Sequence, residues 1–551
     1  MKRKKFLNFE FLVKKHWLWI FFFLILFVHV FFRFYQLNSV PPSPSLDEVS
    51  LGYNAFSLLT VNRDEYGTRL PILLRAYDDW RPALYVYLVM PFVKVFGLSA
   101  LAVRLPSALL SLISILMTYC LVETLLGKKN LALIASFLLA ISPWHLYLSR
   151  LGHEVNACLA FTLLAIYFLV KAVKEKGLSL LVVSAIFWAL SFYTYQSQKI
   201  FGPLMLLSLG LIYRKPLWSM KKAVIVAGLI GFLLLFPLIR VSLTPEGMMR
   251  FQGTSIFGQP SELYQLAAKR MTRDYQQGDI LGFFIDNRQL AMGLVVLRAY
   301  LSHFNPIWLF FNDGAEKHKI PSLGLFYLWE LPLLLVGAYQ LAAGRFSRQS
   351  KYLLFSWLLI APLAASLTTD APHAMRIFNV LPVPQLLAAL GVMALFKKTK
   401  FKSWRTALVI IFLIFSLGFL WHHYFVNFPY EQSASFQSPL AEAIKFVLPI
   451  QGQYRQIVFT NQNHGYQSYM FYLFFSQYEP LIYLFQGGTI SGGYNEMHQF
   501  GRYQFRPIDW EKETRGGEIL YIGNVQDFPE EVMPLKEFNL LNGEKAMVAV
   551  E

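Results

Sequence analysis

The chain has 551 residues, of which 55% are hydrophobic and 15% are charged. Soluble proteins carry about 25% charged residues, so this composition argues against a soluble enzyme and favours a membrane protein. The net charge of +17 could suggest nucleic acid, but the basic residues cluster in short loops between apolar runs. Such clustering indicates orientation in a membrane, and no nucleic-acid partner is expected.

Apolar runs long enough to cross a bilayer recur along most of the chain. Met1 to Lys15 is basic and precedes the first run, and no small-residue cleavage site follows, which predicts an uncleaved first helix. Both cysteines, Cys120 and Cys158, fall inside apolar runs, so no disulfide is predicted. We predict a polytopic α-helical membrane protein with eleven spans, at about 17–36, 104–126, 130–149, 156–172, 178–194, 199–213, 223–240, 323–342, 352–367, 377–395 and 406–422.

Short basic loops predict how these spans thread the membrane, because cytoplasmic loops are enriched in Lys and Arg. The apolar stretch 83–97 is short for a crossing and contains Pro91 and Lys94, so we predict that it lies in the outer interface as a juxtamembrane helix. The N-terminus is then cytoplasmic and the C-terminus is outside. The loops assigned to the cytoplasm are Lys128-Lys129, Lys171 to Lys176, Arg214 to Lys222, Arg345 to Lys351 and Lys397 to Arg405.

The outer face then receives two long loops, at about 37–103 and 241–322, and two short corners, at 149–155 and 368–376. We divide the chain into a transmembrane domain, 1–425, and a small extracytoplasmic α/β domain, 426–551. Apolar β-branched patches in this tail predict its strands. They are Gln456 to Thr460, Leu481 to Phe485, Glu518 to Gly523 and Ala546 to Val550.

Two adjacent carboxylates, Asp47 and Glu48, follow a proline-rich turn in the first outer loop and precede a helix-like run, 49–59. One interpretation is structural, with Ser45 or Asp47 capping that helix. The other is chemical, because a carboxylate near an apolar surface has a raised proton affinity and can act as a general base.

Arg81 stands at the start of the juxtamembrane helix, where it could reach lipid headgroups or hold a ligand phosphate through two hydrogen bonds. Orientation rules place few basic residues on the outer side, so a group of them there indicates a ligand, although some would be lipid anchors or structural ion pairs. The further candidates for substrate contact are Tyr53, Asp78, Asp79, Arg104, Arg150, His153, Glu154, Arg240, His303, His373 and Arg376.

Several chemistries find no support in the sequence. No glycine-rich phosphate loop, His-Glu-x-x-His pattern or Cys/His zinc spacing is present, so no metal site and no obligatory cofactor are predicted. Charged residues inside the spans are too sparse for an ion relay, which weakens a transporter interpretation.

Several motifs resemble the bacterial protein O-mannosyltransferase-type branch of the C-type (GT-C) membrane glycosyltransferases, which includes polyprenyl-phosphate-mannose-dependent and aminoarabinose-transferase-like enzymes. The similarity covers about residues 10–425. The Trp-Trp-Asp sequence of oligosaccharyltransferases is absent, and the tail does not resemble the β-trefoil inserts of eukaryotic members. The motifs are Leu46-Asp47-Glu48, Ser142-Pro143-Trp144-His145 to Asn156, Tyr193 to Gln198, His303-Phe304-Asn305-Pro306 with Leu309-Phe310-Phe311, and Pro372 to Arg376.

The resemblance implies a polyprenyl-phosphate-linked sugar as donor and a hydroxyl on a protein, glycan or lipid as acceptor. It implies that Asp47, with Glu48 beside it, is the catalytic base. It also implies that Arg81 binds the donor phosphate, assisted by Arg376 and His303. The expected reaction is a single inverting displacement at the outer face of a bacterial plasma membrane.

Two other classes stay open. A flippase or transporter of lipid-linked saccharides would also gather arginines on one side, but it usually shows repeated halves, which are not visible here. A non-catalytic membrane receptor whose tail binds glycan would leave the acids of the first loop without a role. Activity in membranes supplied with lipid-linked sugar separates the three classes.

Overall fold

The structure is a computed structural model that describes residues 9–258, 262–312, 318–397, 403–493 and 496–551. The basic residues before position 9 and part of the predicted Lys397 to Arg405 loop lie outside the described residues. By internal contacts the chain divides into two units. One unit comprises 1–35, 110–148 and 158–414, and the other comprises 36–109, 149–157 and 415–551.

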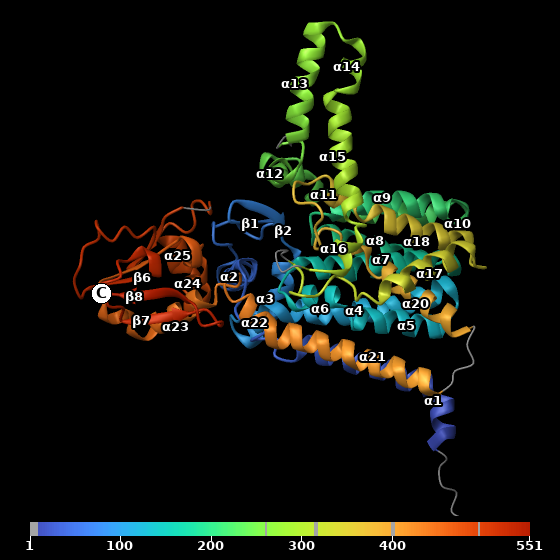
Figure 1. Ribbon diagram of the computed structural model, residues 1–551, viewed down its shortest axis with the longest axis horizontal. Helices are drawn as coiled ribbons and strands as arrows, with labels where there is room; N and C mark the ends of the chain where they lie inside the picture. Colours follow the sequence, from blue (N-terminus) through green and yellow to red (C-terminus); the bar gives the residue numbers. More distant parts are fainter. Residues whose placement is uncertain (1–8, 259–261, 313–317, 398–402, 494–495) are drawn as a thin grey trace, which may run out of the picture. The chain divides into compact units, whose positions relative to one another are not determined.

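The first unit is helical, and the described part of the chain contains no strand there. Its long apolar helices run side by side (Figure 1). The helices that lie in it or enter it are α1 (Phe9–Phe34), α4 (Ala100–Leu126), α5 (Lys129–Ala140), α6 (Pro143–Arg150), α7 (Glu154–Glu175), α8 (Leu178–Phe192), α9 (Gln198–Ile212), α10 (Arg214–Ser219), α11 (Lys221–Ser242), α12 (Pro245–Thr254), α13 (Glu262–Gln277), α14 (Ile280–Ile285), α15 (Arg288–Ser302), α16 (Pro306–Phe310), α17 (Glu330–Ala343), α18 (Arg348–Ile360), α19 (Leu363–Ser366), α20 (Val383–Lys397) and α21 (Ser403–Trp421).

Each predicted span overlaps one helix or two consecutive helices, although residues 323–329 of the span at 323–342 precede α17 and are not helical. Among the described residues, six helical segments are long and apolar enough to cross a membrane, and the bent pair α5–α6 would make seven. Three more predicted spans correspond to shorter apolar helices, α8, α9 and α17. The prediction of a polytopic helical membrane protein is therefore confirmed, whereas the number of crossings stays a prediction.

Helices α17 and α20 pack closely because two glycines face the neighbouring backbone. A Cβ atom added at Gly337 would lie 1.7 Å from the carbonyl oxygen of Leu387, and one added at Gly391 would lie 2.1 Å from that of Leu333. Small residues at helix contacts allow this approach in membrane proteins, where dispersion contacts replace the hydrophobic effect.

The second unit contains the first loop and the C-terminal tail. The loop forms α2 (Leu46–Val61), a hairpin of β1 (Leu73–Ala76) and β2 (Asp79–Pro82), and α3 (Leu84–Phe96). The predicted helix at 83–97 is confirmed as α3, shorter by one residue at each end, and its position in the membrane interface stays a prediction. The helices of the tail are α22 (Phe428–Glu431), α23 (Ser438–Ile450), α24 (Ser468–Ser476) and α25 (Pro480–Phe485).

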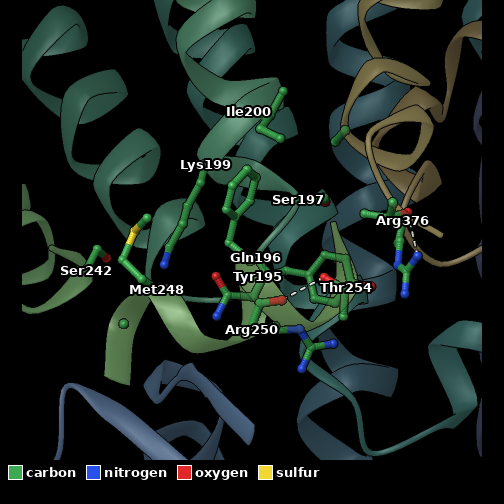
Figure 2. Close-up of a pocket in the computed structure, with 14 residues that line it drawn as sticks. Tyr195, Gln196, Ser197, Lys199, Ile200, Ser242, Met248, Arg250, Thr254 and Arg376 are labelled. Atoms are coloured by element: carbon green, nitrogen blue, oxygen red, sulfur yellow. Dashed lines mark hydrogen bonds between the residues drawn. The ribbon is translucent and has the colours of Figure 1, made fainter. Parts of the chain in front are cut away.

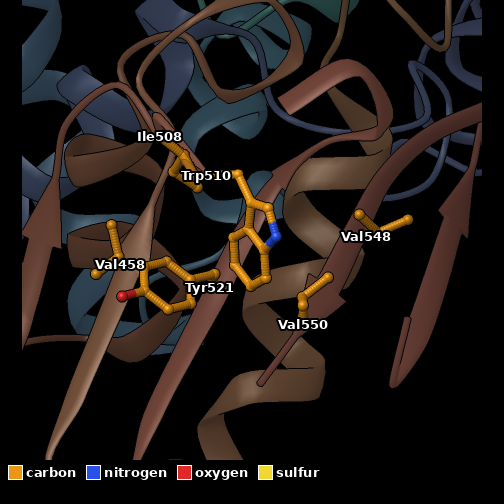
Figure 3. Packing of buried hydrophobic residues seen from close by; sticks show 6 residues of the cluster. All are labelled: Val458, Ile508, Trp510, Tyr521, Val548 and Val550. Carbon is orange, nitrogen blue, oxygen red and sulfur yellow. The ribbon is translucent and has the colours of Figure 1, made fainter. Parts of the chain in front are cut away.

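The tail carries a six-stranded mixed sheet in the order β4-β5-β3-β6-β8-β7. Strand β3 pairs in parallel with β5 and β6, and the remaining pairs are antiparallel. One face holds a core of Val458, Ile508, Trp510, Tyr521, Val548 and Val550 (Figure 3). The strands are β3 (Gln456–Phe459), β4 (His498–Phe500), β5 (Tyr503–Phe505), β6 (Ile519–Asn524), β7 (Lys536–Asn539) and β8 (Lys545–Val550).

The predicted α/β tail is confirmed, and three of its four predicted strands are β3, β6 and β8. The prediction of a strand at Leu481 to Phe485 is wrong, because this segment forms α25 with Pro480 at its first turn. Proline is favoured at that position, since its missing N–H has no helical partner to lose. Strands β4, β5 and β7 were not predicted.

Candidate active site

Helix α2 begins at a capping box formed by Ser45 and Glu48. The Ser45 hydroxyl accepts a hydrogen bond from the Glu48 N–H at 3.3 Å, and the Glu48 carboxylate accepts one from the Ser45 N–H at 2.8 Å. Ser45 is therefore the N-cap, and Asp47 lies one residue before Glu48 in the first turn. The two adjacent acids consequently point in different directions from the same helix end.

Glu48 is only 1% exposed, and its carboxylate accepts hydrogen bonds from an arginine and from backbone N–H groups. Arg104 grips it with Nε and Nη2, at 2.7 and 3.1 Å, and the Gly152 N–H donates to it at 2.8 Å. The other donors of Arg104 bind carbonyl oxygens of Leu37, Pro41 and Ser43. This arrangement joins the first loop to the segment 149–157 of the same unit.

Asp47 is the accessible carboxylate, with 47% of its side chain exposed. Its Oδ1 accepts a hydrogen bond of 2.8 Å from Arg81 Nη1, and its Oδ2 lies 3.9 Å from His153 Nε2. His153 Nδ1 accepts a hydrogen bond from the Val155 N–H at 3.2 Å, and Nε2 is the ring nitrogen that lies toward Asp47. Glu154 lies beside this group, with Oε2 3.5 Å from His153 Nδ1.

Arg81 is buried, with 5% of its side chain exposed, but its hydrogen bonds are incomplete. Among the described residues, neither Nε nor Nη2 of Arg81 has an acceptor. These two N–H groups form the fork that Arg104 uses to hold Glu48. Buried donors are rarely left without partners, so this edge of Arg81 fits an oxygen-bearing ligand such as a phosphate.

Electrostatics keep Arg81 charged. Burial opposes the cation, but the negative charges of Asp47 and Glu154 outweigh it, so the pKa of Arg81 rises above its usual value. A permanent cation with two open donors thus adjoins a half-exposed carboxylate.

The β1–β2 hairpin positions Arg81. Its turn places Tyr77 and Asp78 at positive φ, as two-residue hairpin turns require, and pairs Arg81 with Leu74. The Tyr77 hydroxyl donates to the carbonyl of Leu46 at the start of α2. The hairpin and the helix start are therefore held together, which fixes Arg81 against Asp47.

Three predicted site residues near the hairpin make structural contacts, two with the tail and one in the pairing of β1 with β2. Asp78 accepts hydrogen bonds from Arg75, the Ser491 hydroxyl and the Gly492 N–H. Tyr53 is buried and donates to the carbonyl of Tyr478. Asp79 begins β2 opposite Ala76.

Arg150 is also engaged by its own unit. Its Nη2 donates to the carbonyl oxygens of Gln36 and Val40, and its guanidinium lies over the rings of Tyr424 and Phe425. Arg104 and Arg150 thus serve the packing of the protein, whereas Nε and Nη2 of Arg81 have no acceptor among the described residues.

The other unit contains a separate pocket of about 380 Å³ that carries three cations. Lys199 comes from the start of α9, Arg250 from α12, and Arg376 from the 368–376 corner (Figure 2). Apolar side chains line the rest, among them Ile200, Met248, Phe251 and Ala364.

Backbone pairing holds two walls of this pocket together. Ser255 bridges Thr368, the Thr369 N–H donates to the Thr254 carbonyl at 3.0 Å, and the Ile256 N–H donates to the Leu367 carbonyl at 3.2 Å. Arg376 is oriented by the Thr368 hydroxyl, at 2.5 Å, and by the exposed Asp370 carboxylate, at 3.5 Å. A cationic pocket with apolar walls suits an anionic, amphipathic ligand.

The predicted histidines support the corner beside this pocket. His303 Nδ1 donates to the Ala299 carbonyl at 2.8 Å, and its Nε2 accepts from the His373 N–H at 3.2 Å. Burial lowers the pKa of His303 to about 4, and burial together with the charge of Arg376 lowers that of His373 to about 2. Both rings are therefore neutral near pH 7, and the hydrogen bonds of His303 occupy both ring nitrogens. Arg240 lies in the last turn of α11.

Sequence reasoning missed Lys199, Arg250 and Glu65. A signal existed for Lys199, which interrupts the start of a predicted span, and a weaker one for Arg250 in the middle loop. Glu65 gave none. It is fully buried in the second unit, where Asn54, Tyr469 and Thr489 donate hydrogen bonds to its carboxylate.

Comparisons with known proteins agree with this architecture. Residues 80–240, less than half of the chain, match the family described as dolichyl-phosphate-mannose-protein mannosyltransferase. No curated protein matches the sequence.

Two solved structures are similar in fold. ArnT from Cupriavidus metallidurans, bound to undecaprenyl phosphate, has a TM-score of 0.50 at 12% identity, with 97% of this chain and 98% of that chain covered. An Archaeoglobus fulgidus oligosaccharyltransferase, tethered to an acceptor peptide with an NVT sequon, has a TM-score of 0.51 at 13% identity. The alignment covers 84% of this chain but 63% of the oligosaccharyltransferase, so the chain spans less than two thirds of that enzyme.

The chain therefore has the GT-C fold of these structures, and it is a multi-pass membrane protein. Its segment 80–240 is similar to the protein mannosyltransferase family, which confirms the predicted resemblance.

Proposed function

We propose that the protein is a membrane glycosyltransferase that moves a sugar from a polyprenyl-phosphate donor to an acceptor hydroxyl. The observation that carries this proposal is the juxtaposition of Asp47, a half-exposed carboxylate, with Arg81, a buried cation whose Nε and Nη2 lack acceptors among the described residues. The carboxylate can accept a proton, and the cation can hold the phosphate that departs. The undecaprenyl phosphate bound to ArnT supports a lipid-linked donor.

In this scheme the acceptor hydroxyl loses its proton to Asp47 while its oxygen attacks the anomeric carbon. The bond between that carbon and the phosphate oxygen breaks, and its electron pair leaves with the phosphate. Arg81 stabilises the negative charge that develops there, in a buried environment where such stabilisation is strong. Attack from the face opposite the phosphate inverts the anomeric centre. The scheme requires no nucleotide and no metal.

We assign Glu48 a positioning role, because Arg104 and two backbone N–H groups already saturate its carboxylate. The charge of Glu48 holds the start of α2 and thereby orients Asp47. His153 orients the second oxygen of Asp47 in the same way.

We assign the pocket beside Arg376 to the same class of ligand, a lipid-linked phosphate. Lys199, Arg250 and Arg376 supply charge, and the apolar walls suit the first isoprene units of the lipid. His303 then acts through the 373–376 backbone rather than by touching the phosphate. The sugar, mannose or another hexose or pentose, and the acceptor, protein, glycan or lipid, are left to experiment.

We further propose that transfer takes place at the extracytoplasmic face of a bacterial plasma membrane. The support is the distribution of basic loops in the sequence, which favours an N-terminus in the cytoplasm and a first loop and tail outside. Accessibility of an introduced cysteine in the tail, such as Met533→Cys, to an impermeant reagent on intact cells tests this orientation. Met533 is highly exposed, so labelling only after permeabilisation would reverse the assignment.

The test of function is transfer of radiolabelled mannose from polyprenyl-phosphate-mannose by reconstituted protein. Removal of a general base typically costs about 100-fold or more, so Asp47→Asn should lose transfer by at least this factor. Glu531→Gln, at an exposed site of the tail, is the matched control and should keep full activity. Full transfer by Asp47→Asn would exclude Asp47 as the base.

A binding measurement separates the phosphate site from the chemistry. Arg81→Gln removes charge-assisted hydrogen bonds and should weaken polyprenyl-phosphate binding roughly tenfold or more. Asp47→Asn should leave binding nearly unchanged. Movement of lipid-linked sugar across vesicles without product formation would instead favour the flippase interpretation.

A further inference from the structure

Helices α13, α14 and α15 form a hairpin that projects from the first unit. Figure 1 shows α13 and α15 running together across the direction of α9 and α18. Asp279 caps α14 through the Gly282 N–H, and Arg270 pairs with Asp286 at 3.6 Å. At the base, the Tyr300 hydroxyl donates to the Leu359 carbonyl of α18 at 3.0 Å. The hairpin is thus an ordered arm anchored at one end.

One face of α15 is a row of exposed leucines. Leu290, Leu294, Leu297 and Leu301 are spaced by four, three and four residues, so they line one side of the helix. Each is between 50% and 56% exposed. A regular row of this kind is the apolar face of an amphipathic helix that has no apolar partner in the described part of its unit.

The apolar surface continues to the tip of the arm. Ile280, Leu281, Phe284 and Ile285 in α14 are between 58% and 74% exposed. A patch of this extent is unusual on a water-facing surface and marks an interaction site or a membrane contact.

Helix α13 supplies a contrasting polar side. Its exposed positions include Lys269, Arg270 and Arg273, together with Gln276 and Gln277. An apolar row combined with basic and amide side chains is the pattern of helices that lie in the membrane interface.

The helix that precedes the arm has the exposed apolar surface of a lipid-facing span. Helix α11, which leads into the arm through α12, is a candidate span, and only 11% of its apolar 18-residue window is buried. Its exposed side chains include Leu229, Leu233 and Phe236. With α9 and α18 crossing the bilayer as predicted spans, an arm that runs across their direction lies along the membrane surface (Figure 1).

We propose that the α13–α15 arm lies in the bilayer interface, with the leucine row of α15 and the tip of α14 in contact with lipid. The occupant of this face is the bilayer rather than a second protein. The helix that leads into the arm, α11, exposes apolar side chains as a lipid-facing span does, and the basic residues of α13 match anionic headgroups. The arm then increases the area over which the middle loop, 241–322, contacts the membrane, next to the segment 242–254.

Depth-dependent fluorescence quenching tests this proposal without any transfer assay, so it succeeds or fails independently of the proposed function. The background is Cys120→Ser with Cys158→Ala, which removes both native thiols. Leu294→Cys is labelled with a small fluorophore, and Gln276→Cys on α13 is the matched control on the same arm. Both proteins are reconstituted in phosphatidylcholine–phosphatidylglycerol vesicles.

Brominated acyl chains should quench the label at position 294 at least about threefold more strongly than at position 276, and aqueous iodide should show the reverse order. Leu297→Cys and Gln277→Cys repeat the comparison on the next turn. Equal iodide access at 294 and 276 would overturn the proposal. Protection of 294 from both quenchers would also overturn it, because the face would then be covered by protein. Matching unfolding midpoints of the four variants confirm that the labels report on folded protein.

Discussion

Replacing Glu65 by glutamine should make the protein more stable above neutral pH. Glu65 is fully buried, and its carboxylate accepts hydrogen bonds from Asn54 at 3.0 Å, Thr489 at 2.8 Å and Tyr469 at 3.4 Å. Burial, only partly offset by these donors, raises its pKa from an ordinary 4.5 to about 7. The group joins the first loop to the tail within the second unit.

The sign follows from proton binding in the two states. Between pH 4.5 and about 7 the unfolded chain has released this proton while the folded protein retains it, so the free energy of unfolding falls as the pH rises. A pKa difference of one unit corresponds to about 1.4 kcal/mol, so the shift from 4.5 to about 7 lowers the free energy of unfolding by roughly 3 kcal/mol in total. This loss is complete above pH 7. Glutamine is neutral throughout, and its amide can take the place of the protonated acid. Glu65→Gln should therefore remove this loss.

Unfolding midpoints measured by tryptophan fluorescence in detergent between pH 5 and 8 check the prediction. For a unit of about 200 residues, 3 kcal/mol corresponds to roughly 6–12 °C. The wild-type midpoint should fall by about this amount across the range and the Glu65→Gln midpoint should not. Glu531→Gln should follow the wild type. An equal fall in Glu65→Gln and wild type would refute the argument, since another group would then cause it.

Two further substitutions test the packing on which the site depends. Glu48→Gln leaves the buried Arg104 without its anion and should lower the free energy of unfolding by about 3–5 kcal/mol in the same assay. An effect below about 1 kcal/mol would show that the pair is not buried. Gly337→Ala should lower the unfolding midpoint because its Cβ meets the α20 backbone, whereas Gly228→Ala, which has open space, should be neutral or slightly stabilising. Equal effects at the two glycines would contradict the close approach of α17 and α20.

Local sequence rules account for much of the helical part. Long apolar runs must become helices in a bilayer, because no water is present to satisfy the backbone, and each of the eleven predicted spans overlaps a helix. The start of α2 was also readable, since Ser45 followed by Glu48 three residues later is a capping-box pattern. In the tail, Leu481 to Phe485 misled the strand prediction because a short apolar run fits either a strand or a helix.

The roles within the site were decided by tertiary structure. Asp47 and Glu48 are equivalent in sequence, yet the fold gives Glu48 a buried arginine and leaves Asp47 half exposed beside Arg81. Glu65 shows the same dependence on distant partners, because Tyr469 and Thr489 lie some 400 positions away in the chain.

The sequence by itself determined that this is a helical membrane protein with acids and arginines in its long loops, because hydrophobicity and capping act between near neighbours. Which of those charges pair with each other, and which face a ligand, was decided only when the chain folded. Burial and hydrogen bonding between distant segments set the free energy of each charge, and no local pattern contains them.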